Sequence, residues 1–459
     1  MIGKRLLSLI LTVVLCMTLV ACGNSTKTTD TNKDSGSKDT PAITQPANQP
    51  SEESSSDAVS LRVAWWGGQE RHNMTIEALD AYTEKNGTQF TYEYNSWGSY
   101  FENLATQAVG NNLPDIIQMS TTDIINFSKN GQIIYLQPYV DKGIIDTTNM
   151  EENSLSGGMV DGKLMGITTG VNTVTVVYNK EIFDQAKVAY PTEDWTWSQF
   201  LEKAKAVYDA TGIQTEIPFL SEARWLVENM VRCFGYDFFS KDGLSLPWAK
   251  DEKVVTAVEK AIQDIYDGVK AGYFVDPEVQ VAWSTTEDSY IAQGKASMSF
   301  LLSNFYAVYS TALGKELGMV LLPRLDEGSQ TGMYLNPNMY WCISSNCKNP
   351  EVAAKVINYL INDEEACSII GTDRGIFLSS AIRNMLSSSA DTDVYTNNTI
   401  KYLSKVSGFV DAINPADPLN SAEAISVLKT NFQAAMYGEM SAKDCIADFI
   451  AQSSTILQQ

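Results

Sequence analysis

The fold is decided by residues 61–94, which read LRVAWWGGQERHNMTIEALDAYTEKNGTQFTYEY. Apolar residues alternate through 61–65, which is typical of a strand. A helix is expected to begin with Asn73 as its cap and to end at Gly87. Alternating aromatic residues then predict a second strand over 90–94. Strand, helix and strand in this order favour an α/β fold with largely parallel sheets.

The same alternation of strands and helices continues along the chain. Residues 99–109 predict a helix that leads into a buried strand at 115–117. Further helix signals are a capping box formed by Thr196 and Gln199, an apolar stripe over 254–269 and the pair Asn349-Pro350 at a helix start. Residues 58–459 are too many for a single hydrophobic core, so two lobes are expected.

The N-terminus carries an export signal. Lys4 and Arg5 precede an apolar run over 6–20, and small residues then lead into Cys22. This pattern resembles the lipobox of bacterial lipoproteins, which implies that 1–21 is a signal peptide and that Cys22 carries a diacylglyceryl anchor. An ordinary signal peptide with an incidental cysteine is the alternative. Residues 22–57 are almost entirely polar and predict a disordered tether, with a cleaved propeptide as the other interpretation.

Composition narrows the classes of partner. The net charge is −22, from 55 acidic and 33 basic residues, and no basic stripe is present, so nucleic acid is not an expected partner. Two of the seven cysteines fall in the export segment, and the other five show no zinc-ribbon spacing. These five are Cys233, Cys342, Cys347, Cys367 and Cys445. Either Cys342 and Cys347 close a small loop, or all five are free thiols.

Four segments carry a resemblance to a known family. They are LPDII at 113–117, VYNKEIF at 177–183 with Pro191 and WTWSQF at 195–200, QGKASM at 293–298, and ISSNCKNPEVAA at 343–354. In this order they resemble extracellular solute-binding protein family 1, the sugar-binding lipoproteins of bacterial ABC importers related to maltose-binding protein. Ser297 departs from the alanine of the family pattern. The resemblance extends over nearly the whole chain after the tether.

The resemblance implies a two-lobed, periplasmic-binding-protein-like α/β fold with a hinge and a ligand cleft between the lobes. We expect lobe 1 at 58–165 plus 332–385 and lobe 2 at 166–331 plus 386–459. It also implies a carbohydrate ligand and permease and ATPase subunits as partners. We further expect a lipid-anchored monomer on the outer face of the cytoplasmic membrane of a Gram-positive bacterium, with no cofactor. Whether a calcium ion assists is left open.

A sugar site needs aromatic platforms for ring faces and planar polar groups for hydroxyls. The run at 65–72, WWGGQERH, leaves the first strand where the resemblance places ligand contacts. The candidate ligand-binding residues are Trp66, Glu70, Arg71, Trp97, Asp123, Asn172, Trp225, Trp283, Asn304, Trp341 and Arg374. Phe305 or Tyr306 are alternatives to Asn304. Tryptophans of this set can instead be core residues, and Arg374 can instead form a surface salt bridge.

Enzymatic alternatives are constrained by a single histidine. Any Ser-His-Asp or Cys-His mechanism would have to use His72, and a histidine-rich metal site is not possible. A glycosidase carboxylate pair is defined in space and not in sequence, so a secreted, lipid-anchored carbohydrate-active enzyme is the runner-up. A surface adhesin ranks lower because no repeat is apparent. The favoured interpretation is therefore a binding protein and not an enzyme.

Overall fold

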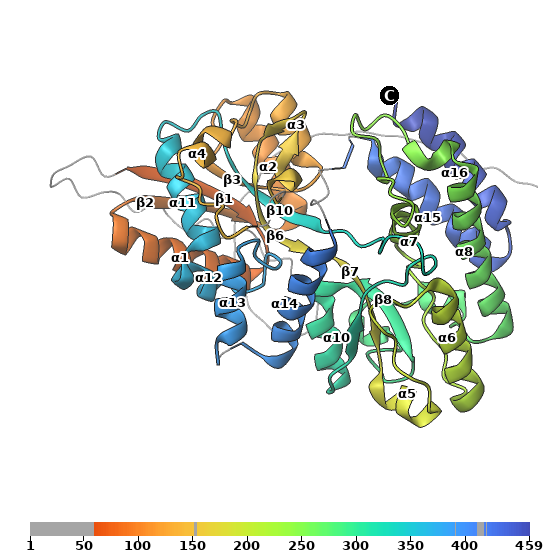
Figure 1. Cartoon of the computed structure of the whole chain (residues 1–459). Helices are drawn as coiled ribbons and strands as arrows, with labels where there is room; N and C mark the ends of the chain where they lie inside the picture. The colour runs from red at the N-terminus through yellow and green to blue at the C-terminus, as the bar shows by residue number, and fades with distance from the viewer. Residues whose placement is uncertain (1–58, 151–153, 391, 411–416, 419) are drawn as a thin grey trace, which may run out of the picture. The chain divides into compact units, whose positions relative to one another are not determined.

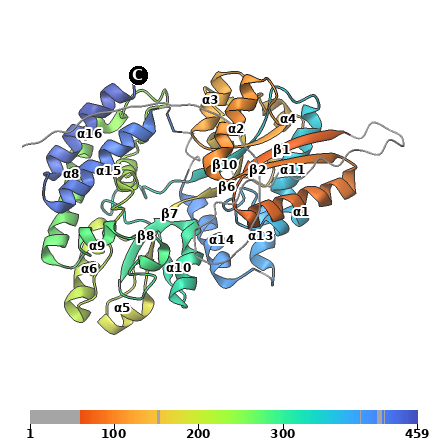
Figure 2. The ribbon, with the colours of Figure 1, turned by 180° about the vertical axis from the view of Figure 1, so that it is seen from behind.

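The computed structural model describes residues 59–150, 154–390, 392–410, 417–418 and 420–459 (Figures 1 and 2). The predicted signal peptide, Cys22 and tether lie outside the described residues. The strands are β1 (Ser60–Trp66), β2 (Gln89–Asn95), β3 (Ile116–Met119), β4 (Met159–Val160), β5 (Lys163–Leu164), β6 (Ile167–Asn172), β7 (Val174–Tyr178), β8 (Met298–Leu302), β9 (Gly318–Val320) and β10 (Asn336–Ile343).

The described helices alternate with the strands as predicted only over residues 60–129, and beyond that point they come mostly in uninterrupted runs. They are α1 (Gln69–Asn86), α2 (Trp97–Val109), α3 (Asp123–Lys129), α4 (Gln137–Asp141), α5 (Lys180–Ala186), α6 (Trp197–Thr211), α7 (Ala223–Arg232), α8 (Glu252–Ala271), α9 (Pro277–Val281), α10 (Tyr306–Leu313), α11 (Pro350–Asn362), α12 (Glu364–Ile370), α13 (Ser380–Ser388), α14 (Val394–Val406), α15 (Ser421–Tyr437) and α16 (Ala442–Ile456). Short 3-10 turns are η1 (Ser154–Gly158), η2 (Pro247–Lys250), η3 (Thr286–Asp288), η4 (Ser303–Phe305) and η5 (Ser407–Phe409).

The larger sheet has the strand order β2-β1-β3-β10-β6. β1 is parallel to both β2 and β3, as predicted, but β10 is antiparallel to both of its neighbours, β3 and β6. The prediction of largely parallel sheets is therefore wrong for this half of the sheet. The physical reason is that the chain leaves the sheet through β6 and returns beside it through β10, so the returning strand must run the opposite way.

The smaller sheet, β8-β7-β9, is antiparallel throughout. The chain passes from the larger sheet into the smaller one between Asn172, the last residue of β6, and Val174, the first of β7. The boundary expected near 165 lies before β6, whereas hydrogen bonding to β10 keeps β6 in the larger sheet. The change of sheet thus rests on a single intervening residue, Thr173.

Alternate residues of β1 face two separate apolar clusters. Val63 and Trp65 pack in the cluster that contains Leu79 of α1. Ala64 and Trp66 pack in the other cluster, with Tyr100 of α2 and residues of α3. This period of two is what a sheet buried on both faces requires, and Figures 1 and 2 show α1 and α2 beside β1 and β2.

Local signals set several helix ends. The structure confirms the capping box, in which the Thr196 N–H donates to Gln199 Oε1 at 3.0 Å and the Gln199 N–H donates to Thr196 Oγ1. Gly87 ends α1 with a φ of 72°, a conformation that glycine adopts without steric cost. The start of α1 was predicted at the wrong residue: the helix begins at Gln69, and Asn73 accepts a hydrogen bond from the Gln69 side chain inside it.

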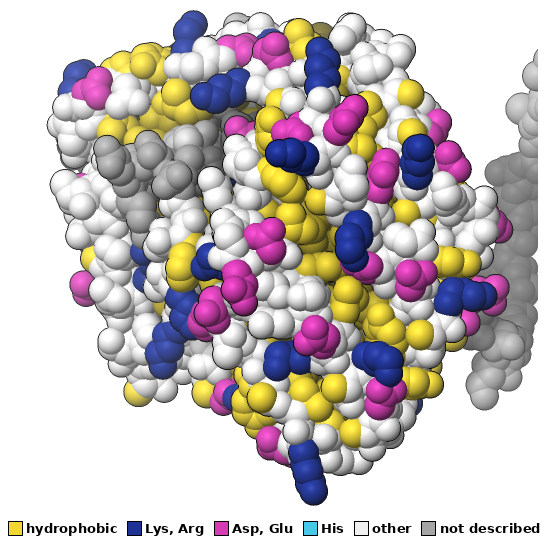
Figure 3. Space-filling model, turned by 45° about the vertical axis from the view of Figure 1, so that its right-hand side comes forward, with side chains coloured by type: hydrophobic (Ala, Val, Ile, Leu, Met, Phe, Trp, Pro, Cys, Tyr) yellow, Lys and Arg dark blue, Asp and Glu magenta, His cyan; other side chains and the backbone are white. Residues whose placement is uncertain are grey.

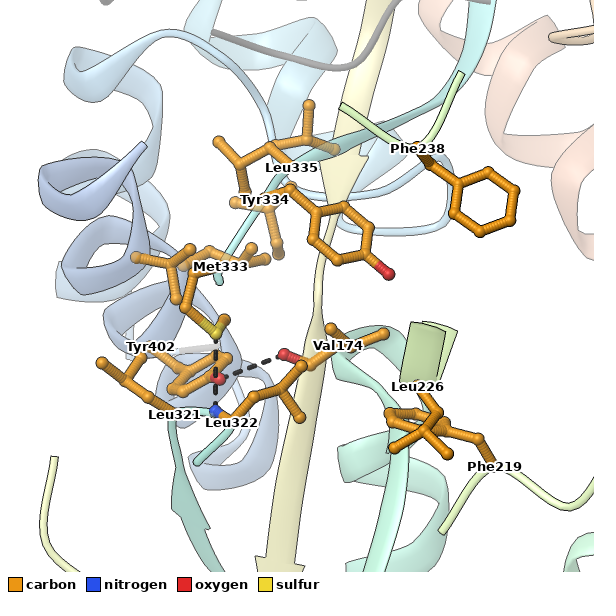
Figure 4. Packing of buried hydrophobic residues seen from close by; sticks show 14 of the residues in the cluster. Val174, Phe219, Leu226, Phe238, Leu321, Leu322, Met333, Tyr334, Leu335 and Tyr402 are labelled. Atoms are coloured by element: carbon orange, nitrogen blue, oxygen red, sulfur yellow. Dashed lines mark hydrogen bonds between the residues drawn. The ribbon is translucent and has the colours of Figure 1, made fainter. Parts of the chain in front are cut away.

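The crossing strand β7 is anchored in the apolar core (Figure 4). The Tyr402 hydroxyl of α14 donates to the carbonyl oxygens of Val174 and Val320, at 3.2 Å and 3.3 Å. Nearby, the Leu322 N–H donates to the sulfur of Met333 at 3.4 Å. A buried tyrosine usually needs such a partner, and here it ties a C-terminal helix to the strand that joins the sheets.

Three further observations concern chemistry and surface. Cys342 and Cys347 do not form a disulfide, and the other cysteines of the described chain are also free. Over the same residues, no helix is long and apolar enough to cross a membrane. On the face that Figure 3 draws, basic side chains are scattered among acidic and apolar ones and are not gathered in a stripe.

Candidate functional site

Four strand ends meet at one edge of the larger sheet. β1, β2 and β3 are parallel, and β6 runs the same way because both β3 and β6 are antiparallel to β10. The candidates Trp66, Trp97, Asp123 and Asn172 each lie at, or shortly after, the carboxyl end of one of these strands. The topology therefore brings the four to the edge where α/β sheets bind ligands.

The smaller sheet ends at the same crossing point. β8 is antiparallel to β7, so β8 ends beside the start of β7. The Thr173 N–H donates to the Ser303 hydroxyl at 3.2 Å. Asn172 precedes Thr173 and Asn304 follows Ser303, so each asparagine is next in sequence to one partner of this hydrogen bond. Asn172 is buried, and its Oδ1 has no hydrogen-bond partner among the described residues. Asn304 is exposed on η4.

An aromatic cluster stands at the ends of β1 and β2. The Trp97 ring is 57% exposed, and its centroid lies 5.1 Å from that of Trp66 and 5.2 Å from that of Phe101. Trp66 is only 7% exposed and also contacts Tyr100. The two tryptophans thus differ in role: Trp66 is buried and packs against the other rings of the cluster, and Trp97 exposes its ring to solvent.

Two other candidates are buried behind this edge. Trp341 is 1% exposed and lies under the Arg374 guanidinium, whose carbon is 5.3 Å from the ring centroid. Arg374 is 3% exposed and donates to Gln118 Oε1 at 2.9 Å. Burial and the charge of Arg71 lower the pKa of Arg374 to about 9, and Asp373 pairs with Arg71 at 2.6 Å. Arg374 is therefore a buried cation that is hydrogen-bonded to Gln118 of β3.

The remaining candidates lie apart. Glu70 is exposed in the first turn of α1. Trp225 of α7 is half-buried against Phe219, with centroids 5.7 Å apart, and Trp283 is half-buried against Tyr290 at 5.1 Å. Within the described residues no ring contact joins either tryptophan to the aromatic cluster at the ends of β1 and β2.

A pocket of about 400 Å³ lies between α3 with the β4–β5 hairpin and α7 with the C-terminal segment. Its lining comes from Ile125 and Lys129, from 159–161, from one face of α7, from 237–244 and from residues around Asp417 and 457–459. None of the predicted candidates lines it, although Asp123 and Trp225 lie on the same helices. The volume is within the range of small-molecule sites.

A row of charged residues on α7, Arg224, Glu228 and Arg232, forms one wall of this pocket. Both Nη atoms of Arg224 donate to the carboxylate of Asp417, one of them at 2.8 Å. Arg224 Nε donates to Glu228 at 3.1 Å, and Arg232 Nε donates to the other oxygen of Glu228 at 3.1 Å. Burial alone would lower the pKa of Arg224, but Asp417 and Glu228 outweigh it and raise that pKa. The spacing of Arg224, Glu228 and Arg232 by four residues is the sequence pattern that could have indicated this wall.

Aromatic residues lie against the charged residues of α7. The Arg224 guanidinium carbon is 5.3 Å from the ring centroid of Phe238 and 5.5 Å from that of Phe239, and both phenylalanines line the pocket. Arg232 lies 5.0 Å from the ring of buried Tyr334. The Tyr334 hydroxyl has no hydrogen-bond partner in the described chain, and in Figure 4 it points to the side on which Phe238 lies. Burial and Glu228 raise the pKa of Tyr334.

The described residues contain no group of histidine, cysteine, aspartate or glutamate side chains placed to hold a metal ion. The structure thus offers an exposed indole at the sheet edge and, separately, a pocket with aromatic and ion-paired walls; Asn172 Oδ1 and the Tyr334 hydroxyl are buried oxygens without a partner among the described residues. Such an arrangement suits a neutral, hydroxyl-rich solute.

Comparison with known proteins gives a consistent result. A family model described as "Bacterial extracellular solute-binding protein" matches residues 77–399. A galactooligosaccharide-binding protein of Bacillus subtilis is 24% identical over 70% of this chain and 73% of its own length. An arabinooligosaccharide-binding protein of Halalkalibacterium halodurans is 30% identical over 30% of each chain.

Solved structures show the same fold. A family 1 extracellular solute-binding protein from Alicyclobacillus acidocaldarius superposes with a TM-score of 0.75, at 24% identity over 88% of this chain and 100% of its own. A periplasmic oligogalacturonide-binding protein from Yersinia enterocolitica gives a TM-score of 0.73, at 20% identity over 87% and 99% of the two chains. The expected two-lobed α/β fold is confirmed.

Proposed function

Because the chain belongs to the family of bacterial extracellular solute-binding proteins, we propose that it captures an oligosaccharide for an ABC importer. The observation that carries this proposal is the pocket of about 400 Å³, which joins aromatic side chains to carboxylate and guanidinium groups. A sugar presents apolar ring faces and a rim of hydroxyls, so it needs both kinds of group. Two relatives named as oligosaccharide-binding proteins support the substrate class.

Recognition rests on both parts of the site. The ion-paired wall of α7 offers hydrogen bonds to hydroxyls, and Phe239 offers a half-buried aromatic face. Trp97 extends the binding surface along the sheet edge, with Asp123, Asn172 and Asn304 as polar contacts. A solute that touches both sheets shifts the population toward a closed form, which the membrane permease then reads. The protein itself catalyses no reaction.

The cellular setting is also part of the proposal. A diacylated Cys22 holds the protein at the outer face of the cytoplasmic membrane of a Gram-positive bacterium, because two acyl chains give stable anchoring. The partners are the permease and ATPase subunits of the importer, and the protein acts as a monomer. The polar segment 22–57 gives the binding unit reach from its anchor.

Calorimetry tests this function. The protein is titrated with galacto-, arabino- and malto-oligosaccharides after a thermal-shift screen, since a tight ligand raises the melting temperature by mass action. We expect saturable binding of at least one of them. Chromatography of the incubated sugars serves as the control: cleavage products would support the carbohydrate-active enzyme instead, and no binding to any oligosaccharide would overturn the proposal.

A further inference from the structure

We propose that the pocket selects uncharged oligosaccharides and rejects those that contain uronic acids, an inference that rests on the proposed function. Proteins commonly bind a sugar carboxylate with a planar guanidinium, which donates two parallel hydrogen bonds to it. The question is therefore whether the guanidinium groups of this pocket are already paired with carboxylates of the protein.

The charge of Arg224 is already paired within the protein. Its two Nη atoms hold both oxygens of Asp417 in the end-on, bidentate geometry that a uronate would require. Its Nε donates to Glu228, and its guanidinium carbon lies 5.3 Å and 5.5 Å from the ring centroids of Phe238 and Phe239. A ligand carboxylate would have to displace Asp417 from a part-buried ion pair, which leaves a carboxylate without its partner.

Arg232 is engaged as well. Its Nε donates to Glu228, its Nη1 lies 3.4 Å from Asp237, and its guanidinium covers the ring of Tyr334. Glu228 thus lies between the two arginines and accepts from both. The charges of this wall alternate in sign and are paired with one another. The wall is therefore a poor receptor for an anion.

The pocket lining as a whole also carries side chains of both charges. The basic side chains are Lys129, Arg224, Arg232 and Lys241, and the acidic side chains are Asp161, Glu228, Asp237, Asp242 and Asp417. The acidic groups outnumber the basic ones. Lys129 and Lys241 are exposed, where water and salt weaken their attraction for a carboxylate.

A uronate in this pocket would find both arginines already paired with carboxylates. The ligand carboxylate would lose hydration and gain only the solvent-screened attraction of Lys129 and Lys241, and it would lie beside carboxylates of the same sign. Neutral sugar hydroxyls meet no such penalty, because hydroxyl groups accept from guanidinium N–H groups and donate to carboxylates without disturbing the ion pairs. Rejection of the wrong partner by unpaired charge is a common route to specificity.

The test compares ligands of equal length on the full chain by calorimetry. The neutral probes are galactotriose and arabinotriose, and the acidic probe is trigalacturonate. We expect at least one neutral probe to bind and trigalacturonate to bind at least about tenfold more weakly than it. Asp417→Asn keeps the shape of the side chain and releases Arg224, so the ratio of acidic to neutral affinity should rise by about tenfold or more and should fall again in high salt.

Two further variants make the result decisive. Asp237→Asn removes the exposed carboxylate that lies beside Nη1 of Arg232, so it tests the same idea without disturbing the part-buried pair of Arg224 and Asp417. Asp209→Asn removes an equal charge from the exposed pair with Lys205, outside the pocket, and should leave both affinities unchanged.

The outcomes separate the two proposals. If trigalacturonate binds the unaltered protein as tightly as the neutral probes, or if neither pocket variant raises the acidic-to-neutral ratio, the charge-selection proposal is wrong and oligosaccharide binding stands. If no probe and no other oligosaccharide binds, the proposed function itself fails.

Discussion

Trp65 donates its indole N–H to Nδ1 of His72 across 3.1 Å, and the two residues join the first strand to the first helix. The imidazole is buried and also stacks on Tyr94, with ring centroids 4.2 Å apart. A histidine that accepts at Nδ1 is neutral, because both nitrogens of the imidazolium ion are donors. Protonation of His72 would therefore break this bond.

The pKa of His72 is expected below its usual value of 6.5, because burial and the charges of Arg374 and Arg71 disfavour the cation. The resulting stability is fully present above about pH 6.5 and is lost as the pH falls toward the lower, folded-state pKa. Since the chain has one histidine, its NMR titration measures this pKa directly. His72→Gln should remove the corresponding part of the pH dependence of unfolding; a titration at or above pH 6.5 would contradict the prediction.

Trp97 and Trp66 should respond differently to truncation. Trp97→Ala removes an exposed ring, so it should weaken oligosaccharide binding tenfold to a hundredfold, or about 1.5–3 kcal/mol, with little change in melting temperature. Trp66→Ala opens a cavity under the cluster and should lower the free energy of unfolding by about 3–5 kcal/mol. Calorimetry and thermal unfolding of both variants measure the contrast, and equal loss of stability in the two would contradict it.

Glu216 should make stability depend on pH in the opposite sense to most carboxylates. Burial raises its pKa and outweighs the hydrogen bonds from Ser299 and Ser289. A raised folded-state pKa contributes stability below the unfolded value of 4.5, and this contribution is lost as the pH rises through the folded pKa.

Glu216→Gln mimics the protonated form at every pH. The free energy of unfolding of this variant relative to the unaltered protein should therefore increase from pH 4 to pH 7, as measured by urea titration. A difference that does not change with pH would show that the Glu216 carboxyl titrates normally.

Cys22→Ala tests the anchor. The variant should either leave the membrane fraction or accumulate with its signal peptide attached, because the acceptor of the lipid is missing. Detergent-phase partitioning with mass measurement of the N-terminus distinguishes these outcomes. A processed variant that still partitions wholly into detergent would overturn the lipoprotein assignment.

Much of the fold was predictable because its signals are local. The alternation in 61–65 and the capping box at Thr196 depend only on near neighbours, and both are confirmed. The antiparallel position of β10 could not be predicted in this way, since it depends on pairing with Met119 and Asn172, far away in the sequence.

The site was only partly accessible to the same reasoning. Trp97 and Asn172 could be assigned to strand ends, which a strand prediction locates. The pocket was missed because Arg224 and Asp417 lie 193 positions apart in the sequence, and no local pattern records their contact. The burial of Trp341 and Arg374 likewise follows from tertiary packing.

The insertion of β10 between β3 and β6 has a consequence for biosynthesis. The chain is made from its N-terminus, so the strand that completes the middle of the larger sheet emerges after everything up to residue 335. Until then β3 and β6 each have an unpaired edge that other chains can join. A nascent or truncated chain that ends before Asn336 cannot close this sheet, and its folding must wait for a late, long-range pairing that is intrinsically slow.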